Sequence, residues 1–197
     1  MKTLIPRTLT LVASVFLLTV SSVAVAQGQS TLKTDATKSS IQAVGAKITG
    51  EHTLTFSNFV GEAKVDDGAV SALSFTVQVS DLSSEMGDSE WGQKLVGHLR
   101  SADFFDVATF PTASFESTEV KPNKTKHGTH TVTGKLTLRG QSRMVSFPAT
   151  VEVQKNKVKG SAVFTINRKD FAIVYAGKPD DLIKDLVLLK IALNFDR

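Results

Sequence analysis

Between residues 70 and 195, the chain repeatedly alternates apolar and polar residues with a period of two. The pattern is clearest in five segments, residues 75–79, 131–139, 145–154, 161–167 and 187–195. Such alternation is typical of β-strands that bury one face and expose the other. Many antiparallel strands of this kind predict an all-β sandwich or barrel.

Residues that favour turns separate these segments at short intervals. They are Asp66-Asp67-Gly68, Lys121-Pro122-Asn123, Arg139-Gly140 and residues 156–160. Pro148 lies on the polar face of its segment, and because proline cannot donate to a strand ladder, it predicts a sheet edge or a bulge there. No internal repeat or linker interrupts the pattern, so we expect one domain.

One segment, about residues 89–99, has the pattern of an amphipathic helix. Trp91, Leu95 and Leu99 recur at positions i, i+4 and i+8, which places them on one stripe. Two glycines within the segment each cost a helix about 1 kcal/mol relative to alanine, so tertiary packing must hold it in place. We expect this helix to lie across the end of the β-structure.

The N-terminus has the three parts of a secretory signal. Lys2 and Arg7 precede an apolar run at residues 9–20, and Ala24-Val25-Ala26 forms a small-x-small cleavage site. An uncleaved membrane anchor is the rival interpretation, but the run is short for a bilayer span and lacks a basic flank after it. We therefore predict a cleaved signal peptide at residues 1–26, and a periplasmic mature domain at residues 27–197 without a membrane span.

Composition and charge exclude several classes of function. The chain has no cysteine, which rules out disulfides, thiol chemistry and thiolate metal sites. Its 23 basic and 19 acidic residues give a net charge of +4, which falls to +2 without the signal peptide. That excess is too small to predict nucleic-acid binding. We find no catalytic constellation, no nucleophile elbow and no glycine-rich phosphate loop, and we expect no cofactor.

The phenylalanines permit two interpretations. An eight-stranded barrel is near the size at which side chains either fill the interior or leave room for one ligand. The aromatic residues could therefore form a closed core or line a cavity for an apolar molecule. They are Phe75, Phe104, Phe105, Phe110, Phe115, Phe147, Phe164 and Phe171.

The order and spacing of several short motifs resemble those of the YceI-like family of exported, lipocalin-like proteins. The resemblance covers essentially the whole mature chain, although Ala43 and Leu54 stand where a related branch has tryptophan and glycine. It implies an antiparallel eight-stranded lipocalin-like barrel with a short helix near its mouth. It also implies binding of a polyprenol or a quinone tail inside the barrel. The motifs are Lys47-x-x-Gly50-x-His52, Leu95-x-x-His98-Leu99-x-Ser101-x-Asp103-Phe104-Phe105, Phe110-Pro111, Val132-x-Gly134-x-Leu136-Thr137-x-Arg139-Gly140 and Asn167-Arg168-x-Asp170-Phe171.

In such a barrel we expect twelve apolar residues to contact the ligand. His52, His98 and Arg168 are expected either at the ligand headgroup or in structural hydrogen bonds, with Arg168 paired to Asp170. The twelve are Phe75, Val77, Trp91, Leu95, Phe104, Phe105, Phe110, Phe115, Leu136, Phe147, Phe164 and Phe171.

Two other classes of function stay open beside an isoprenoid carrier. A closed barrel could serve as an envelope stress or interaction protein through its outer surface. A metal-dependent hydrolase or sensor would need the histidines. However, His127 and His130 lie on a polar turn without an adjacent carboxylate, which favours a solvated turn and no metal site. The sequence also leaves open whether the protein forms a homodimer.

Overall fold

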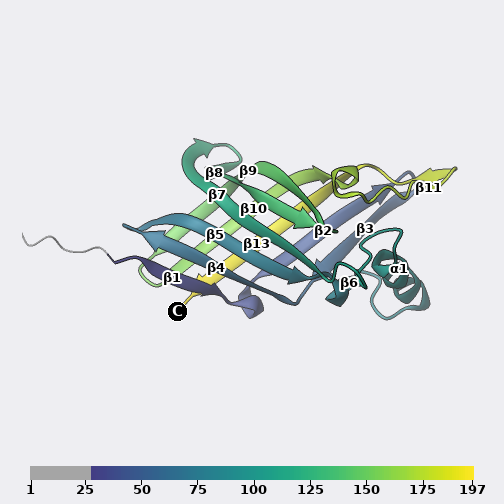
Figure 1. The fold of residues 1–197 in the computed structure, drawn as a ribbon, viewed down its shortest axis with the longest axis horizontal. Helices are drawn as coiled ribbons and strands as arrows, with labels where there is room; N and C mark the ends of the chain where they lie inside the picture. Colours follow the sequence, from purple (N-terminus) through teal and green to yellow (C-terminus); the bar gives the residue numbers. More distant parts are fainter. Residues whose placement is uncertain (1–27) are drawn as a thin grey trace, which may run out of the picture.

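The computed structural model describes residues 28–197, and the predicted signal peptide at residues 1–26 lies outside the described residues (Figure 1). The described chain forms a closed eight-stranded antiparallel barrel with one short α-helix, as predicted. None of the described helices has the length and apolar character needed to cross a membrane. The elements are β1 (Ser30–Thr34), η1 (Ala36–Lys38), β2 (Ser40–Lys47), β3 (Gly50–Phe56), β4 (Phe59–Asp66), β5 (Ala69–Gln78), η2 (Val79–Asp81), β6 (Leu82–Ser84), α1 (Glu90–Arg100), β7 (Thr112–Thr125), β8 (Gly128–Leu138), β9 (Gln141–Gln154), β10 (Lys157–Asn167), η3 (Arg168–Phe171), β11 (Gly177–Lys178), β12 (Asp181–Leu182) and β13 (Leu186–Asp196).

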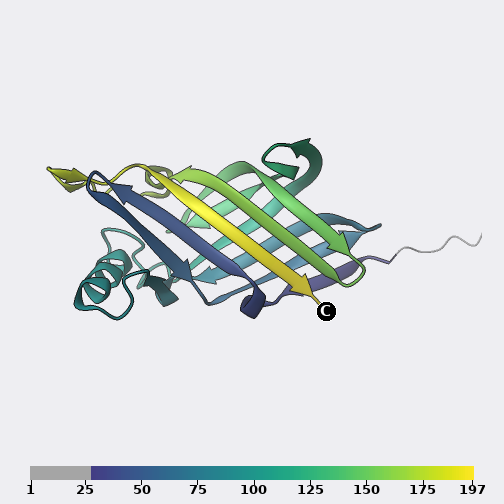
Figure 2. The same ribbon diagram turned by 180° about the vertical axis from the view of Figure 1, so that it is seen from behind.

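The eight barrel strands follow the order β1-β4-β5-β7-β8-β9-β10-β13, and β13 pairs back with β1. The closing pairs are Lys33 with Asp196 and Thr34 with Phe195. Three N-terminal strands are interrupted, because β1 continues into β2 through η1, β3 into β4 through two residues, and β5 into β6 through η2. The first half of β13 pairs with β2 and its end pairs with β1. Both halves of the interrupted strand β1–β2 therefore lie along β13 (Figure 2).

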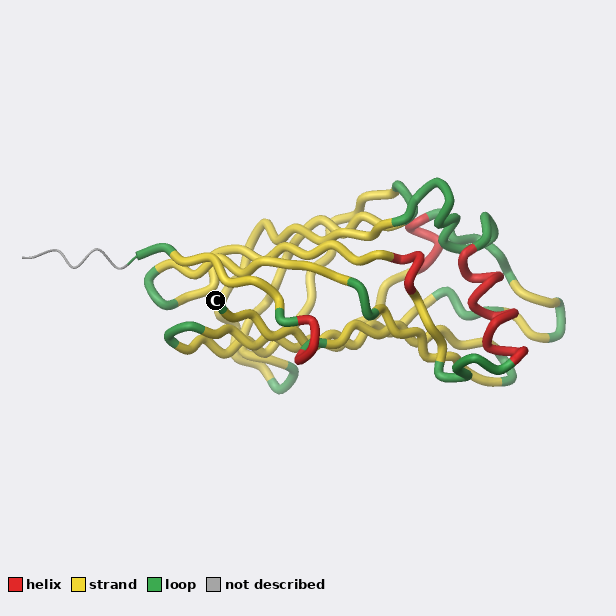
Figure 3. Tube along the Cα trace, turned by 90° about the horizontal axis from the view of Figure 1, so that it is seen from below, coloured by secondary structure: helices red, strands yellow, loops and turns green. Residues whose placement is uncertain are grey.

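The helix α1 lies at one end of the barrel (Figure 3), which we call the open end because strands separate there, and we call the opposite end, where β1 pairs with β13 and β9 with β10, the closed end. In the described chain, β6 pairs only with β3, and the ladder between β9 and β10 stops at Ala149 and Ala162. Pro148 lies just beyond that last pair, where its missing N–H removes no bond to β10, which agrees with the predicted edge. The strands therefore separate at this end, where α1 and η3 lie.

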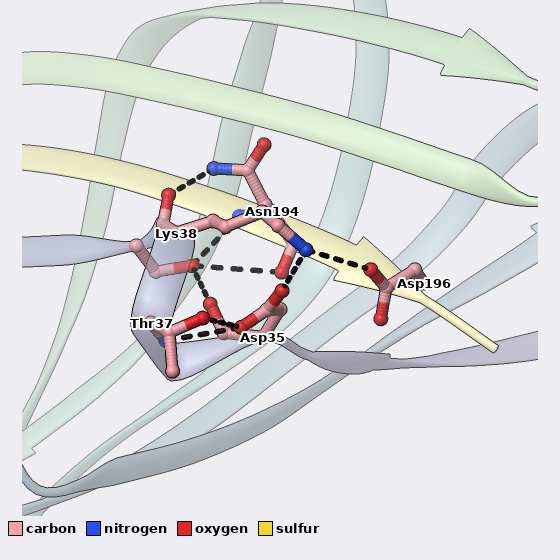
Figure 4. A network of polar contacts seen from close by, with 6 residues as sticks. Asp35, Thr37, Lys38, Asn194 and Asp196 are labelled. Atoms are coloured by element: carbon pink, nitrogen blue, oxygen red, sulfur yellow. Dashed lines mark hydrogen bonds and ion pairs between the residues drawn. The ribbon is translucent and has the colours of Figure 1, made fainter.

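The break between β1 and β2 is tied to the end of β13 by polar side chains (Figure 4). Asp35 caps η1 by accepting hydrogen bonds from the Thr37 backbone N–H at 3.0 Å and the Thr37 hydroxyl at 2.6 Å. The same carboxylate pairs with Lys38, and the Asn194 side-chain amide donates to the Lys38 carbonyl. Lys38 also lies 3.9 Å from Asp196. This network holds the broken strand where the barrel closes.

We expect the network to make stability depend on acid pH through Asp35. Hydrogen bonds from Lys38 and Thr37 lower the pKa of Asp35 from 3.8 to about 2. A carboxyl whose pKa is lowered on folding stabilises the fold above its ordinary pKa, and this contribution is lost as pH falls toward the folded-state value. Between pH 4 and pH 2, the unfolding temperature of the Asp35→Asn variant should therefore fall less steeply than that of the wild type.

Circular dichroism melts at pH 5, 3 and 2 measure this difference in slope. Asp180→Asn is the matched control, since it removes one exposed carboxylate elsewhere. Equal slopes for wild type and Asp35→Asn would contradict the expectation.

Two of the predicted turns are confirmed as two-residue hairpins. The central residues Asp67 and Gly68 have φ values of 50° and 77°, and Arg139 and Gly140 have 49° and 69°. Positive φ at both positions is the geometry that matches the twist of paired strands. The turn predicted at residues 121–123 is wrong, because β7 runs on to Thr125. Past residue 116, β7 has no partner on its β5 side in the described chain, so a proline there removes no ladder bond on that side.

Gly134 allows one of the core aromatic rings to lie against β8. A Cβ at this position would lie 2.5 Å from both the Phe115 ring and the Glu116 carbonyl oxygen. We expect Gly134→Val to lower the free energy of unfolding by about 2–3 kcal/mol, because overpacking forces the ring and the strand to move. Denaturant unfolding measures this loss. Gly160→Val is the control, since a Cβ there meets no atom within 4 Å, and an equal loss in both variants would contradict the steric argument.

Candidate ligand-binding cavity

The barrel interior is not filled by side chains but encloses a cavity of about 160 Å³, which we call the central cavity. Its walls come from the inward-facing residues of the barrel strands, and Leu99 of α1 lies at the open end. Arg168 is the only charged residue among those that line it in the described chain. Seven phenylalanines contribute, and they are Phe56, Phe75, Phe104, Phe105, Phe115, Phe147 and Phe164.

Two further spaces continue the central cavity along the barrel. Toward α1, a space of about 260 Å³, the mouth chamber, shares Gly45, Leu54 and Leu99 with it. Toward the closed end, a space of about 50 Å³, the end chamber, shares Phe147 and Ile191 with it. The site is therefore elongated and runs from the open end deep into the barrel. The mouth chamber alone has several polar side chains, namely Lys47, His52, His98, Tyr175, Lys178 and Asp181.

Aromatic rings line the boundary between the central cavity and the end chamber. Phe147 and Phe164 stack with ring centroids 4.0 Å apart and an interplanar angle of 2°. Phe75 and Phe115 stack at 5.3 Å, and Phe115 lies 5.6 Å from Phe147. Since Phe75, Phe115 and Phe147 line both spaces, these rings lie where the central cavity meets the end chamber.

The structure brings most of the predicted contact residues to this site. Leu95 lines the mouth chamber. Eight others line the central cavity, and they are Phe75, Val77, Phe104, Phe105, Phe115, Leu136, Phe147 and Phe164.

Three predicted contact residues lie elsewhere. The Trp91 side chain is 69% exposed, and the Lys94 ammonium lies 4.9 Å from the centre of its ring. Phe110 packs against Gly140, and Phe171 is a buried residue of η3 itself. None of the three lines the central cavity or either chamber.

The exposure of Trp91 follows from how α1 is rotated. The helix begins after Ser89, whose hydroxyl accepts a hydrogen bond from the Gly92 N–H at 3.1 Å, as an N-cap residue does. Gly92 is buried, and a Cβ there would lie 2.3 Å from the Gly87 carbonyl oxygen. Gly92 therefore packs on the turn before the helix while Leu99 lines the cavity, and the expected Trp91 stripe is wrong at its first residue.

His98 lies at the mouth chamber between polar and aromatic neighbours. Its Nε2 lies 3.1 Å from the Asp103 carboxylate. Its ring meets Phe104 and Tyr175 edge to face, with centroids 5.0 and 4.9 Å away. These contacts connect α1 to the segment after it and to the segment between η3 and β11.

His52 lies at the same chamber, on β3. Its Nδ1 lies 2.8 Å from one oxygen of Glu85, whose other oxygen accepts a hydrogen bond from the Thr53 N–H at 2.9 Å. Burial raises the pKa of Glu85, but hydrogen bonds from His52 and from backbone N–H groups outweigh burial, so its pKa lies below the ordinary value. The carboxylate is therefore charged at neutral pH and holds the end of β6 to β3.

Arg168 has a structural role beside the cavity, where its side chain holds several segments together, and we call it a clasp. The side chain is only 4% exposed, and Nη1 donates to the Ile173 carbonyl at 2.7 Å. Nε and Nη2 donate to the carbonyls of residues 183–184 at 3.2 and 3.3 Å, and Nη2 also lies 3.2 Å from the Asp185 carboxylate. The predicted pairing with Asp170 is wrong, because the acidic partner comes from the segment just before β13. Arg168 thus joins three segments at the open end.

The other two histidines lie on the hairpin between β7 and β8, away from the cavity. His127 is in the turn, and the His130 Nδ1 lies 2.8 Å from the Thr129 hydroxyl oxygen. Within residues 28–197, no three His, Asp or Glu side chains converge into a group that could hold a metal ion.

Several residues of the site escaped the sequence reasoning. Tyr175, Lys178 and Asp181 lie in an irregular segment without a helical or alternating pattern. Small inward residues also matter, since Gly45 in β2 leaves the passage between the central cavity and the mouth chamber open. The only available signal was a glycine at an inward position of an alternating strand, which marks either a bulge or empty space.

A model of the YceI-like domain matches residues 32–195. A UPF0312 protein of Pseudomonas paraeruginosa is 36% identical over 126 residues, which are 60% of this chain and 61% of that protein, so the chain spans about three fifths of this relative. The crystal structure of BcnA from Burkholderia cenocepacia matches with a TM-score of 0.69 and 25% identity over 82% of this chain and 98% of BcnA. A polyisoprenoid binding domain from Saccharophagus degradans, implicated in plant cell wall breakdown, shares the fold with a TM-score of 0.63 and 14% identity, covering 84% and 97% of the two chains. With a family model that matches nearly all of the described barrel, the chain belongs to the YceI-like domain family.

Proposed function

We propose that this protein is a non-catalytic carrier that holds one long isoprenoid, such as a polyprenol or a quinone tail, inside its barrel. The observation that carries the proposal is the elongated cavity, whose central part and end chamber are lined almost wholly by apolar groups and whose mouth chamber carries most of the polar side chains. We further propose that the protein works in the periplasm after its signal peptide is cleaved.

The cavity's chemistry supports an apolar chain as the ligand. Each methylene transferred from water to this interior contributes about 0.8 kcal/mol, so several isoprene units can drive tight binding without a polar contact. The central cavity and the two chambers lie in series, and an extended chain can therefore occupy them together. The polar end of such a chain would lie among Lys47, His52, Tyr175 and Lys178 at the mouth chamber.

The residues around the central cavity also support binding without catalysis. Arg168 is the one charged side chain that lines it in the described chain, and its three nitrogens donate to protein carbonyls and to Asp185. A group held in this way has little capacity to transfer a proton or to stabilise a reacting atom. The fold shared with the polyisoprenoid binding domain of Saccharophagus degradans is consistent with an isoprenoid ligand.

Native mass spectrometry of the protein purified from its own periplasm tests the proposal. We expect one apolar adduct of a few hundred daltons or more, and organic extraction should identify it. Polyprenols and quinones added to the stripped protein should restore the adduct. An unliganded mass that these compounds do not change would contradict the carrier function and would favour a protein partner at the outer surface.

A further inference from the structure

Large apolar side chains are exposed at the open end of the barrel. Ile48 is 64% exposed at the turn between β2 and β3, and Leu182 is 47% exposed on β12. The Ile48 N–H donates to the Leu182 carbonyl at 3.2 Å, so the two hairpin tips lie together. Val174 is 63% exposed in the segment after η3, and Trp91 projects from α1. We call these four residues the mouth rim, and the elements that carry them lie at one end of the molecule (Figure 1).

The turns at the closed end differ in character from the mouth rim. They consist of Asp67-Gly68, Lys126-His127 and Lys155-Asn156, which are polar and exposed residues. Exposed apolar side chains on single positions are ordinary in soluble proteins, but a group at one end, around a pocket, marks an interaction surface. The two ends of this barrel are therefore suited to different surroundings.

The mouth rim surrounds the route into the interior. The mouth chamber lies between α1 and the two hairpins, and Leu95 and Ile183 line it on either side. It continues into the central cavity past Gly45 and Leu99. An apolar chain that left a lipid phase at the mouth rim could thus move inward with little contact with water.

Two lysines beside the mouth rim are paired with carboxylates. The Lys47 ammonium lies 2.5 Å from the Asp181 carboxylate, and that of Lys94 lies 2.6 Å from the Glu90 carboxylate. In these pairs the carboxylates neutralise the positive charge of Lys47 and Lys94, which reduces their attraction for anionic lipids. The apolar side chains of the mouth rim are therefore the main contacts that it offers to a partner.

We propose that the mouth rim docks on the surface of a lipid bilayer, with its apolar side chains in the interfacial region and the mouth chamber open toward the membrane. The inference rests on the proposed function, since a long isoprenoid is nearly insoluble in water and has to pass between a membrane and the barrel. Tryptophan favours the membrane–water interface, where its ring is in an apolar environment and its N–H can still be hydrated. Docking of this kind needs only zwitterionic lipid and depends weakly on salt.

The single tryptophan of the chain provides a direct test, because its fluorescence reports on the mouth rim alone. The protein is purified from cells as it is produced there and is mixed with phosphatidylcholine vesicles at 0.1 and 0.5 M NaCl. We expect Trp91 emission to shift to shorter wavelength at both salt concentrations, and lipids brominated on their acyl chains to quench it. Ile48→Asp should weaken partitioning into vesicles by about tenfold or more, as expected when a buried aliphatic side chain is replaced by a charge.

Val163→Asp is the matched control, since Val163 is 61% exposed but lies on β10, away from the mouth rim. Equal weakening by both substitutions would show general adhesion and overturn the proposal. If vesicles leave Trp91 emission unchanged while the protein still takes up polyprenol from detergent micelles, the docking proposal fails and the carrier function stands. If vesicles shift the emission but polyprenol never binds from either source, the carrier function fails and the membrane contact stands.

Discussion

Replacing Gly45 with phenylalanine should prevent ligand uptake while leaving the barrel as stable as before. Gly45 lies on β2 and lines both the central cavity and the mouth chamber, so it marks the passage between them. A Cβ at this position meets no atom within 4 Å, and its φ is not in the left-handed region. A new side chain can therefore occupy the passage without moving its neighbours.

The expected loss of affinity for a polyprenol is about 100-fold or more, because the tail could no longer bury its isoprene units at about 0.8 kcal/mol per methylene. The free energy of unfolding should stay the same or rise, since glycine within a strand costs about 0.5–1 kcal/mol relative to alanine. Native mass spectrometry gives the bound fraction, and denaturant unfolding gives the stability.

Two control variants distinguish a blocked passage from a general disturbance of the barrel interior. Gly45→Ala adds one carbon and should bind normally. Gly160→Phe places the same ring at another inward position where a Cβ meets no atom within 4 Å, but beside the end chamber. It should exclude the longest polyprenols and still admit short ones. Full uptake of a long polyprenol by Gly45→Phe would show that the chain does not enter through the mouth chamber.

Replacing Arg168 with methionine should lower the free energy of unfolding by about 3 kcal/mol or more. The substitution leaves the carbonyls of Ile173, Ile183 and Lys184 without their buried donor, and each unsatisfied buried group costs about 1–3 kcal/mol. Water that enters the gap will recover part of this. Arg168→Lys should also be destabilising, because one ammonium cannot match the fixed fork of guanidinium donors.

Denaturant unfolding measures the loss, and hydrogen exchange should show faster opening of residues 173–185 than of the barrel strands. Asp185→Asn is the matched control, because Asp185 is partly exposed and its ion pair with Arg168 should contribute less than about 1 kcal/mol. If Arg168→Met were as stable as the wild type but had lost its ligand, Arg168 would be a headgroup contact and not a clasp.

The barrel and its helix were predictable because they depend on local patterns. Period-two alternation gives each strand an inner and an outer face, and pairing of adjacent strands through short turns follows from it. Apolar periodicity placed the helix at about residues 89–99, close to its observed bounds, Glu90–Arg100. Resemblance in the order of short motifs added the strand number, which the structure confirms, and the expectation of an isoprenoid ligand.

The rotation of α1 and the partner of Arg168 were not predictable in this way. Apolar periodicity placed Trp91 on the inner face, but Gly92 is the residue of that turn that packs closely, on the Gly87 carbonyl, and Trp91 is exposed. Arg168 was paired with a neighbour in sequence, whereas its partner Asp185 is seventeen residues away. Both errors concern contacts between segments that only the folded chain brings together.

By itself, the sequence determined an antiparallel barrel with a short helix, because alternation, helical periodicity and turn formation are properties of neighbouring residues. Whether the interior was filled or hollow was decided only by the tertiary structure. The same phenylalanines are compatible with either outcome, and the difference depends on which small residues, such as Gly45 and Gly160, face them across the barrel. Empty space is a property of opposing walls, and no single strand specifies it.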